Sequence, residues 1–233
     1  MTPAPFHLAG ERVMLDPSGI LFWPEAGLMA VADLHLEKGS AAAKRGGLVP
    51  PWDSRLTLDR LLPRIRAFQP KTLVALGDSF HDRGGPARLP AAEADRLRRI
   101  AAQMRLIWVL GNHDPVPPEG LPGEAMQELH MGPLSFRHES RGRTPPRSGE
   151  AAEICGHHHP KARIATRGGT VSRPCFIGTE QRLILPAFGC YTGGLDVLHP
   201  AIAALFPRGG RAFLLGADRL FSFALAEIRR QAA

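Results

Sequence analysis

The chain has 233 residues, 44% of them hydrophobic, so it is long enough to bury a sizeable core as one domain. No stretch approaches the roughly 20 apolar residues of a membrane span. The three cysteines cannot form a fully paired disulfide framework, and none has a CxxC spacing. The formal charge of +7 favours polyanionic partners such as nucleic acid, although a chain rich in arginine is often basic for compositional reasons alone.

Three short apolar runs in the first half of the chain end in polar residues, which is typical of strands buried on both faces. They cover residues 28–32, 73–76 and 106–110. Helical patterns lie between them, and this alternation predicts parallel crossovers. Such sheets bind ligands beyond the carboxyl ends of their strands, so the polar residues there are candidates for a site.

The helical pattern before the second strand spans residues 58–68, where apolar residues recur three and four positions apart. Asp53 or Ser54 is available as its N-cap, and Pro63 is expected to kink or split the helix. A second amphipathic pattern, over residues 97–104, precedes the third strand.

The second half has a different character, because helical periodicity fades and short apolar runs suggest strands. These runs cover residues 170–171, 183–185 and 211–215. Residues 216–223 predict a hairpin, and residues 140–150 predict a surface loop. Reduced thiols on apolar strands are expected for Cys155, Cys175 and Cys190.

No internal repeat or linker divides the chain, so a single domain over residues 1–233 is expected. The first residues lack the charged start, apolar run and cleavage site of a signal peptide, which predicts a cytoplasmic location. The architecture we expect is α/β, with two stacked sheets and helices outside them.

Five polar clusters carry the candidate chemistry. They are Asp33-Leu34-His35, Gly77-Asp78, Gly111-Asn112-His113-Asp114, His138 and Gly156-His157-His158-His159. Their carboxylate, amide and imidazole donors suit manganese, iron or zinc, and no thiolate takes part. A two-metal centre needs one bridging carboxylate, and Asp78, alone at its strand end, is placed for it. The alternation within Asp33-x-His35 and His157-x-His159 lets both side chains of an extended segment point the same way.

Each cluster also has a simpler explanation. A lone histidine such as His138 is more often a surface or core residue than a ligand, an aspartate after a strand is common, and Asn-His can form a turn. Five such clusters in order, several with a glycine that permits close approach, favour a metal site over so many coincidences.

The clusters resemble the calcineurin-like metallophosphoesterase superfamily, whose pattern runs DxH, GDxxD, GNHD, a separate H, and GHxH. The resemblance covers residues 33–159 and implies phosphoester hydrolysis and a four-layer α/β/β/α sandwich of two mixed sheets flanked by helices. One metal would be held by Asp33, His35, Asp78 and His159, and the other by Asp78, Asn112, His138 and His157. His113, supported by Asp114, would contact the phosphate and assist the leaving group.

One departure from the pattern lies in the second motif, which here is Gly77-Asp78-Ser79-Phe80-His81-Asp82. Its last acid comes one residue late, which puts Asp82 in doubt as a counterpart but leaves the bridge at Asp78. His81 lies on the same strand-end loop and is expected to face the metals, where its imidazole would contact phosphate. An exposed loop histidine is the alternative.

A narrower resemblance rests on DPSGILFWP, ADLHLEKG, LGDSFHD and LPAFGCYTGGLD, which look like the bacterial ligase-associated DNA damage response endonucleases, the PdeM group. It implies phosphodiester cleavage of DNA in repair, supported by two divalent metals, with manganese expected and iron or zinc as alternatives. It also implies a DNA ligase and a helicase as functional partners. Among the basic residues after the last motif, Arg167 and Arg173 are candidates for DNA binding.

Other functions can use the same residues. A phosphomonoesterase or a nucleotide pyrophosphohydrolase can be built on the same metals, since the far side of the substrate decides between them. A non-catalytic interaction module on this fold should have lost ligands, and no ligand of the pattern is missing here. The sequence has neither a P-loop nor a serine-hydrolase elbow, so we expect no covalent enzyme intermediate.

Overall fold

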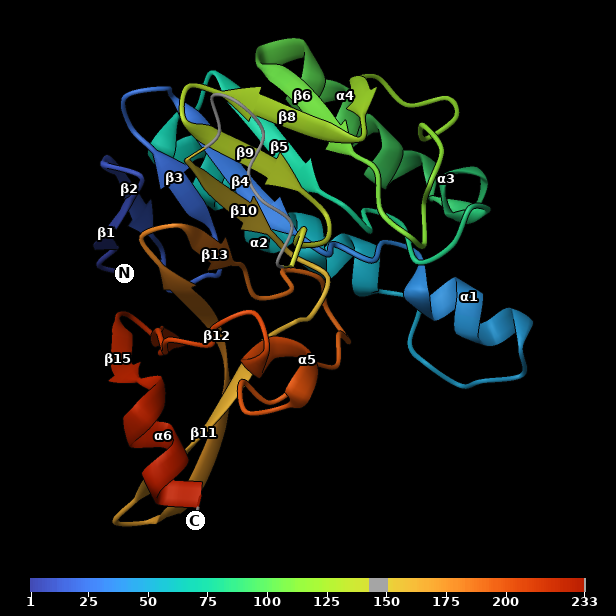
Figure 1. Ribbon diagram of the computed structural model, residues 1–233. Helices are drawn as coiled ribbons and strands as arrows, with labels where there is room; N and C mark the ends of the chain where they lie inside the picture. The colour runs from blue at the N-terminus through green and yellow to red at the C-terminus, as the bar shows by residue number, and fades with distance from the viewer. Residues whose placement is uncertain (143–150, 233) are drawn as a thin grey trace.

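A computed structural model describes residues 1–142 and 151–232. The predicted loop over residues 140–150 therefore lies mostly outside the described residues. Two β-sheets pack face to face, and helices cover their outer faces (Figure 1). The expected α/β/β/α sandwich is confirmed.

Within the described residues, the first sheet has seven strands and contains the three strands predicted in the first half. In spatial order, which is also chain order, they are β1 (Ala4–Leu8), β2 (Glu11–Leu15), β3 (Leu21–Trp23), β4 (Leu28–Ala32), β5 (Thr72–Leu76), β6 (Arg105–Val109) and β7 (Glu124–Met126). Strands β1 to β4 pair antiparallel, whereas β4 to β7 pair in parallel. The predicted crossovers are confirmed, and the carboxyl ends of β4, β5 and β6 meet at one edge.

The second sheet has eight strands in the part of the chain that the structure describes. They are β8 (Glu128–Met131), β9 (Leu134–Arg137), β10 (Ala152–Cys155), β11 (Lys161–Thr166), β12 (Gly169–Thr179), β13 (Arg182–Ile184), β14 (Arg211–Leu215) and β15 (Leu220–Ala224). Their order is β15-β14-β12-β13-β10-β9-β8, with β11 paired to β12 beside this path. Strands β14 and β15 form the predicted hairpin, and β9 and β10 run in parallel. The free cysteines Cys155 and Cys175 lie on strands as expected, whereas Cys190 lies in a turn.

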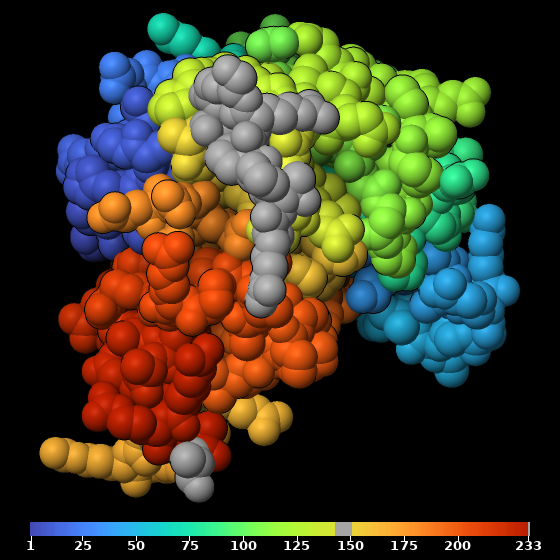
Figure 2. All heavy atoms as spheres, viewed as in Figure 1, coloured from blue at the N-terminus to red at the C-terminus, as the bar shows by residue number. Residues whose placement is uncertain are grey.

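The helices are α1 (Lys38–Lys44), α2 (Asp53–Phe68), α3 (Gly85–Arg88), α4 (Ala91–Gln103), α5 (Pro200–Ala203) and α6 (Leu225–Ala232). Helices α2 and α4 pack on the first sheet through a buried cluster that includes Leu61 and Leu97. Ile202 of α5 and Ile228 of α6 belong to a second cluster on the other sheet. Helix α1 stands out as a lobe at the side of the molecule (Figures 1 and 2). In the described residues, none of the helices has the length and apolar character to cross a membrane.

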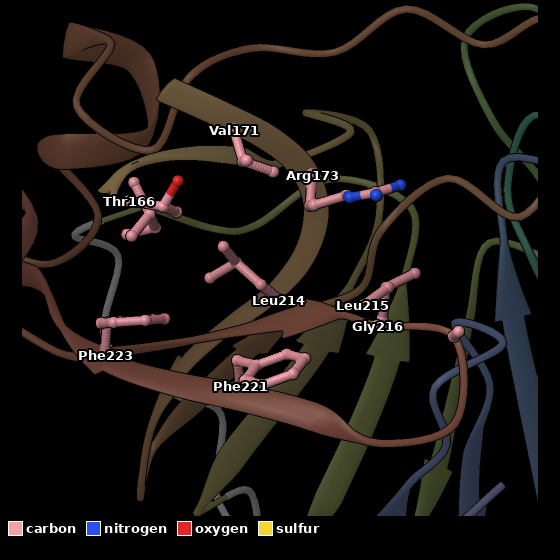
Figure 3. A pocket seen from close by; sticks show the side chains of 10 residues that line it. Thr166, Val171, Arg173, Leu214, Leu215, Gly216, Phe221 and Phe223 are labelled. Carbon is pink, nitrogen blue, oxygen red and sulfur yellow. The ribbon is translucent and has the colours of Figure 1, made fainter. Parts of the chain in front are cut away.

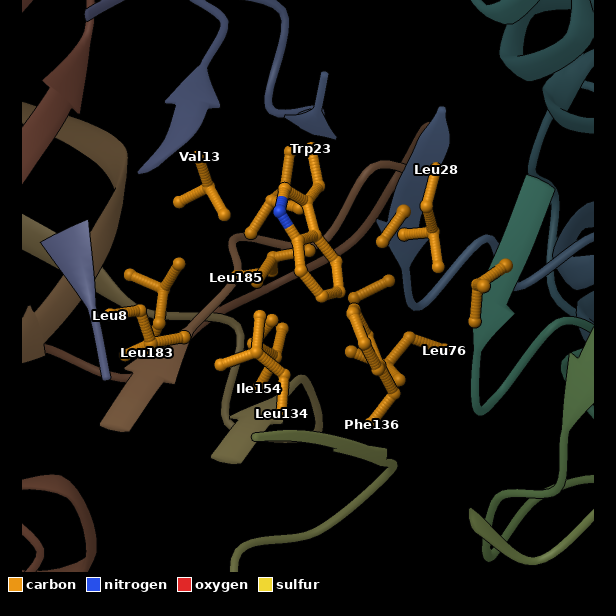
Figure 4. Close-up of a cluster of buried hydrophobic side chains, with 14 of the residues drawn as sticks. Leu8, Val13, Trp23, Leu28, Leu76, Leu134, Phe136, Ile154, Leu183 and Leu185 are labelled. Carbon is orange, nitrogen blue, oxygen red and sulfur yellow. The ribbon is translucent and has the colours of Figure 1, made fainter. Parts of the chain in front are cut away.

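Strand β4 shows how the sheets are fixed against their neighbours. Leu28, which Figure 4 labels, faces the core between the two sheets together with Ala30 and Ala32. Met29 and Val31 face the helices. Because side chains alternate with a period of two, a slip by one residue would exchange these two sets. The register of β4 therefore determines where the polar residues after it emerge.

Helix α2 continues through Pro63, so of the two expected effects, a kink or a split, the split is wrong. Leu58, Leu61 and Ile65 are buried on both sides of the proline. Burial of this apolar face outweighs the loss of one backbone hydrogen bond at the proline.

The predicted N-cap of α2 is also wrong. The helix begins after Trp52, and Asp53 and Ser54 lie in its first turn. Their side chains accept hydrogen bonds from the backbone N–H groups of Lys38 and Glu37, at 2.7 and 2.8 Å. These bonds attach the start of α1 to α2 and fix the chain just after β4.

Candidate metal centre

Five strand ends deliver the predicted ligands to one edge of the sandwich. In the order β4, β5, β6, β9 and β10, these ligands are Asp33 and His35, Asp78, Asn112, His138, and His157 and His159. The first three strands belong to one sheet and the last two to the other, so the centre spans both sheets.

The backbone at these strand ends is left-handed rather than extended. Asp33 and His35 have φ angles of 52° and 43°, and His157 and His159 have φ angles of 68° and 46°. The expected reason for their convergence, alternation along an extended segment, is therefore wrong. Left-handed turns direct these side chains to the centre, at a conformational cost for residues other than glycine.

Asp33, His35 and His159 form the first group of candidate ligands. The Nε2 atoms of the two histidines lie 3.2 Å apart, and His159 Nε2 lies 3.5 Å from Asp33 Oδ1. Asp33 and His35 are almost completely buried. The group offers a carboxylate and two imidazoles to a single cation.

Asp78, His138 and His157 form the second group, with Asn112 beside them. His157 Nδ1 lies 3.1 Å from His138 Nε2. These two nitrogens approach Asn112 Oδ1 at 3.1 and 2.9 Å, respectively. The amide oxygen thus adds a fourth donor to this group.

Asp78 lies between the two groups. Its Oδ2 is 3.8 Å from His35 Nε2 on one side and 3.4 Å from His138 Nε2 on the other. Its Oδ1 accepts a hydrogen bond of 2.9 Å from the backbone N–H of His113. A carboxylate that bridges two metals needs such a central position.

The protonation states of these residues suit metal binding. Burial and the neighbouring His159 lower the pKa of His35 to about 3, so its imidazole is neutral near pH 7. Burial acts to raise the pKa of Asp78, but the hydrogen bond and charge of His138 bring it to about 2. In each group two imidazole nitrogens face each other beside a carboxylate, an arrangement that a shared cation satisfies. The residues therefore fit two divalent metals.

The calcineurin-like phosphoesterase family matches residues 28–173, which is more than half of the chain and includes every candidate ligand. The chain belongs to this family. It is therefore a metal-dependent phosphoesterase, as the sequence motifs predict.

The phosphoesterase is similar to solved structures along most of its length. The nuclease MPE from Pseudomonas putida is 26% identical, with a TM-score of 0.73, and the similarity covers 95% of this chain and 100% of that one. Yfce, a phosphoesterase from E. coli, is 17% identical, with a TM-score of 0.43 and coverage of 85% and 98%. None of the curated proteins matches the chain. The likeness to a nuclease agrees with the narrower sequence resemblance.

Gly77 lets the loop after β5 of the phosphoesterase pass directly against a ligand of the second group. A Cβ atom at Gly77 would lie 2.1 Å from His138 Nδ1, and the φ angle of this glycine is +72°. Only glycine tolerates both the angle and the close approach.

His113 and His81 stack beside the first group of the phosphoesterase, with ring centroids 5.2 Å apart. His113 Nδ1 donates to the backbone oxygen of His81 at 2.8 Å, and His113 Nε2 lies 4.0 Å from Asp78 Oδ2. His81 Nδ1 lies 3.5 Å from His35 Nδ1. The structure thus brings both predicted histidines to the centre.

Asp114 has a different partner from the one expected. Its carboxylate accepts hydrogen bonds from the backbone N–H groups of Phe80 and Gly111, both at 3.1 Å. Direct support of the His113 imidazole is therefore wrong, because the backbone of His81 holds that ring. Burial raises the pKa of Asp114 to about 6. Asp114 braces the loops that follow β5 and β6 against each other.

Three residues suggested by the sequence belong to none of the groups of candidate ligands found among the described residues. They are Asp82, Arg167 and Arg173. Asp82 forms an ion pair of 2.9 Å with Arg88. Arg173 lines an apolar pocket of about 320 Å³ together with Phe221 (Figure 3). Arg167 lies in the turn between β11 and β12. The structure does not bring either arginine to the ligands.

Arg45 was not predicted as a site residue from the sequence. It directly follows α1 and places its Nη2 3.3 Å from His81 Nε2. The available signal was the pair Lys44-Arg45 shortly after the first motif, but the contact depends on how α1 folds back toward the second motif.

The segment over residues 185–196, which borders the first group, was not predicted as part of the site either. A Cβ atom at Gly189 would lie 2.0 Å from the backbone oxygen of Leu34, and one at Gly194 would lie 2.2 Å from that of His159. The segment thus passes between two ligand loops. Its glycines were visible in LPAFGCYTGGLD, but the loops that they approach were not.

Proposed function

We propose that this phosphoesterase is a phosphodiesterase that cleaves DNA strands internally with the help of two divalent metals. The observation that carries the proposal is the position of His113 beside a cluster that fits two metals. Cleavage of a phosphodiester releases an alkoxide that needs a proton, and His113 lies where a proton donor is required.

The ligands divide between the two metals as the two groups suggest. One metal would be held by Asp33, His35, Asp78 and His159, and the other by Asp78, Asn112, His138 and His157. Bound divalent metals supply activation of water near neutral pH and stabilise charge on the phosphate oxygens. We favour manganese on the narrower resemblance, because the carboxylate, amide and imidazole donors suit iron and zinc as well.

His113 is oriented for proton transfer by the backbone of His81. Its Nδ1–H donates to that carbonyl oxygen, so Nε2 is the atom that faces the substrate. As a water oxygen bonds to phosphorus and the bond to the leaving oxygen breaks, the protonated Nε2 gives its proton to that oxygen. The side chain of His113 is 40% exposed, so it regains a proton from solvent.

Several observations support DNA as the substrate. The solved nuclease resembles the chain over 95% of its length. The net charge of +7 favours a polyanion, and His81 offers a second imidazole to the phosphate. Arg167 and Arg173 are proposed contacts for the strand beyond the centre. From the narrower resemblance, the proposed setting is DNA repair in the cytoplasm, with a ligase and a helicase as functional partners.

His113→Ala tests the proposal when single-stranded DNA is compared with bis(4-nitrophenyl) phosphate. Nitrophenolate leaves without a proton, whereas the sugar oxygen of DNA needs one. With manganese, we expect the variant to keep its metals and to lose about 10²–10⁴-fold in kcat on DNA, with a much smaller loss on the nitrophenyl ester. Asp78→Asn serves as the control, because it should lose activity on both substrates together with bound metal.

Equal losses on both diesters in His113→Ala would contradict the role as proton donor. If the wild-type protein leaves DNA intact but rapidly hydrolyses a nucleotide monoester, the phosphodiesterase function itself fails, and a phosphomonoesterase takes its place.

A further inference from the structure

We propose that Arg45, directly after α1, forms a subsite for the phosphate next to the scissile one in a nucleic acid strand. This inference rests on the proposed phosphodiesterase function and identifies what would make the centre prefer a polynucleotide. The subsite lies on the projecting lobe formed by α1 (Figures 1 and 2).

Arg45 directly follows the last residue of α1, and its side chain is exposed. Its guanidinium reaches from the end of the helix to the loop that holds His81.

His81 separates the subsite from the metal ligands. Its Nδ1 lies 3.5 Å from His35 Nδ1, whereas its Nε2, at the other side of the ring, lies 3.3 Å from Arg45 Nη2. The guanidinium is thus one imidazole ring farther out than the first ligand group. This position suits the phosphate that neighbours, in the same strand, the one held at the ligands.

The guanidinium of Arg45 is available to an anion. Arg45 is exposed and forms no ion pair with a carboxylate of the described residues. The carboxylate of Asp82, which follows His81 in the chain, pairs with Arg88. A guanidinium presents paired N–H donors that match two phosphate oxygens.

Helix α1 is held in place relative to the centre. Ser54 Oγ accepts from the backbone N–H of Glu37 at 2.8 Å and donates to the Glu37 carboxylate at 2.7 Å. At the next turn, Ser40 Oγ accepts from Arg88 Nε at 2.9 Å. Because α1 is fixed to both α2 and α3, the subsite exists before the substrate binds, and little ordering is needed on binding.

The subsite acts only on substrates that have a second phosphate. A dinucleotide such as TpT has one phosphate and a trinucleotide such as TpTpT has two. The ratio of kcat/KM for the trinucleotide to kcat/KM for the dinucleotide therefore measures the contribution of the subsite, and losses common to both substrates cancel.

The experiment compares manganese-loaded wild-type protein with Arg45→Ala, Arg45→Lys and Arg99→Ala. Loss of a charge-assisted contact is expected to lower the trinucleotide-to-dinucleotide ratio about tenfold in Arg45→Ala. Arg45→Lys keeps the charge but loses the paired donors, so its ratio falls less. Arg99 is exposed on α4 and its variant removes the same charge, so Arg99→Ala should keep the wild-type ratio.

A second measurement does not depend on turnover. The full chain without added metal binds a fluorescent single-stranded oligonucleotide at increasing salt. Removal of one phosphate contact should lower the slope of log K against log salt by about 0.7 in Arg45→Ala. The slope for Arg99→Ala should equal that of the wild type.

An unchanged trinucleotide-to-dinucleotide ratio in Arg45→Ala would overturn the subsite. If both substrates lost activity equally, Arg45 would act only through His81. If the wild-type protein cleaves neither oligonucleotide, the phosphodiesterase function fails separately. The salt slope then decides alone: a lower slope in Arg45→Ala upholds the phosphate contact, and a wild-type slope rejects it.

Discussion

The candidate ligands combine backbone strain with mutual support. Left-handed φ angles occur at Asp33, His35, Asp78, His157 and His159. Such angles cost a non-glycine residue about 1–2 kcal/mol each. The turns support each other, because the Asp33 carboxylate accepts from the backbone N–H of His157 at 3.0 Å and Asp78 accepts from that of His113. Strain of this kind persists where surrounding contacts fix the conformation, and it concentrates at functional sites.

Gly77→Ala should remove the metal of the second group. The added Cβ would collide with the His138 ring at 2.1 Å, so that ligand must move. After manganese loading, elemental analysis is expected to give about one equivalent of metal instead of two. Gly10→Ala is the matched control: Gly10 has a φ of +85° but no atom within 4 Å of an added Cβ, so both metals should remain. Two equivalents in Gly77→Ala would contradict this account of the second group.

The identity of the candidate ligands could be predicted because each motif is short and lies at a strand end. Their contacts were less predictable. The partner of Asp114 and the approach of Arg45 to His81 depend on loops from distant parts of the chain. The left-handed angles at Asp33 and His35 also run against the usual preference of these residue types, so the sequence favoured an extended segment there.

A buried ionic network connects the strands of the second sheet near the centre. Glu153 of β10 accepts from Arg137 of β9 at 3.0 Å, and it also pairs with Arg182 of β13 and with the hydroxyl of Ser140. Burial acts to raise the pKa of Glu153, but Ser140 and Arg182 bring it below its usual value. The ionised carboxylate therefore stabilises the parallel strands β9, β10 and β13.

Glu153→Gln should lower the free energy of unfolding by about 1–3 kcal/mol at pH 7, because Arg137 and Arg182 lose the negative charge of their partner and one of its acceptor oxygens. Since the folded pKa is depressed, the stabilisation is complete above the unfolded pKa of about 4.5 and is lost as the pH falls through the folded value. Urea unfolding at pH 7 and near pH 3 should show the difference between variant and wild type decreasing with acid.

The matched control for this network is Glu124→Gln. Glu124 pairs with Arg105 across two neighbouring strands of the first sheet, with two contacts of 2.7 Å, but it is exposed. Exposed ion pairs contribute little to stability, so the free energy of unfolding of Glu124→Gln should remain close to that of the wild type at both pH values. A difference for Glu153→Gln that is the same at pH 7 and pH 3 would show that packing, not charge, is responsible.

Elements buried on both faces could be predicted, and partly exposed ones could not. Strand β4 is a continuous apolar run, and β5 and β6 are apolar after their first residues, Thr72 and Arg105. Strand β1 alternates between half-buried and exposed residues, and it was missed together with β2 and β3. Helix α6 was also missed, since Leu225 and Ile228 alone are buried and a pattern of two residues is too short to recognise. At Pro63 the local rule failed because tertiary packing decides the helix.

At the scale of the whole molecule, the centre exists because two sheets end at the same edge. Strands β4 to β6 of one sheet and β9 and β10 of the other contribute the ligands (Figure 1). The order of the second sheet could not be predicted, because β13 inserts between β10 and β12 through a parallel pairing on one side and an antiparallel pairing on the other. Pairings of this kind depend on contacts between segments far apart in sequence, which leave no local pattern.

Cleavage of closed circular single-stranded DNA tests the central claim most directly, because a circle has no end for an exonuclease or a phosphomonoesterase to attack. With manganese, the wild-type protein should convert the circle to linear strands and then to shorter fragments. The conversion should stop with a chelator and in Asp78→Asn, which lacks the carboxylate between the two ligand groups. A circle that stays intact under manganese loading, while the same preparation hydrolyses a nucleotide monoester, would contradict the account.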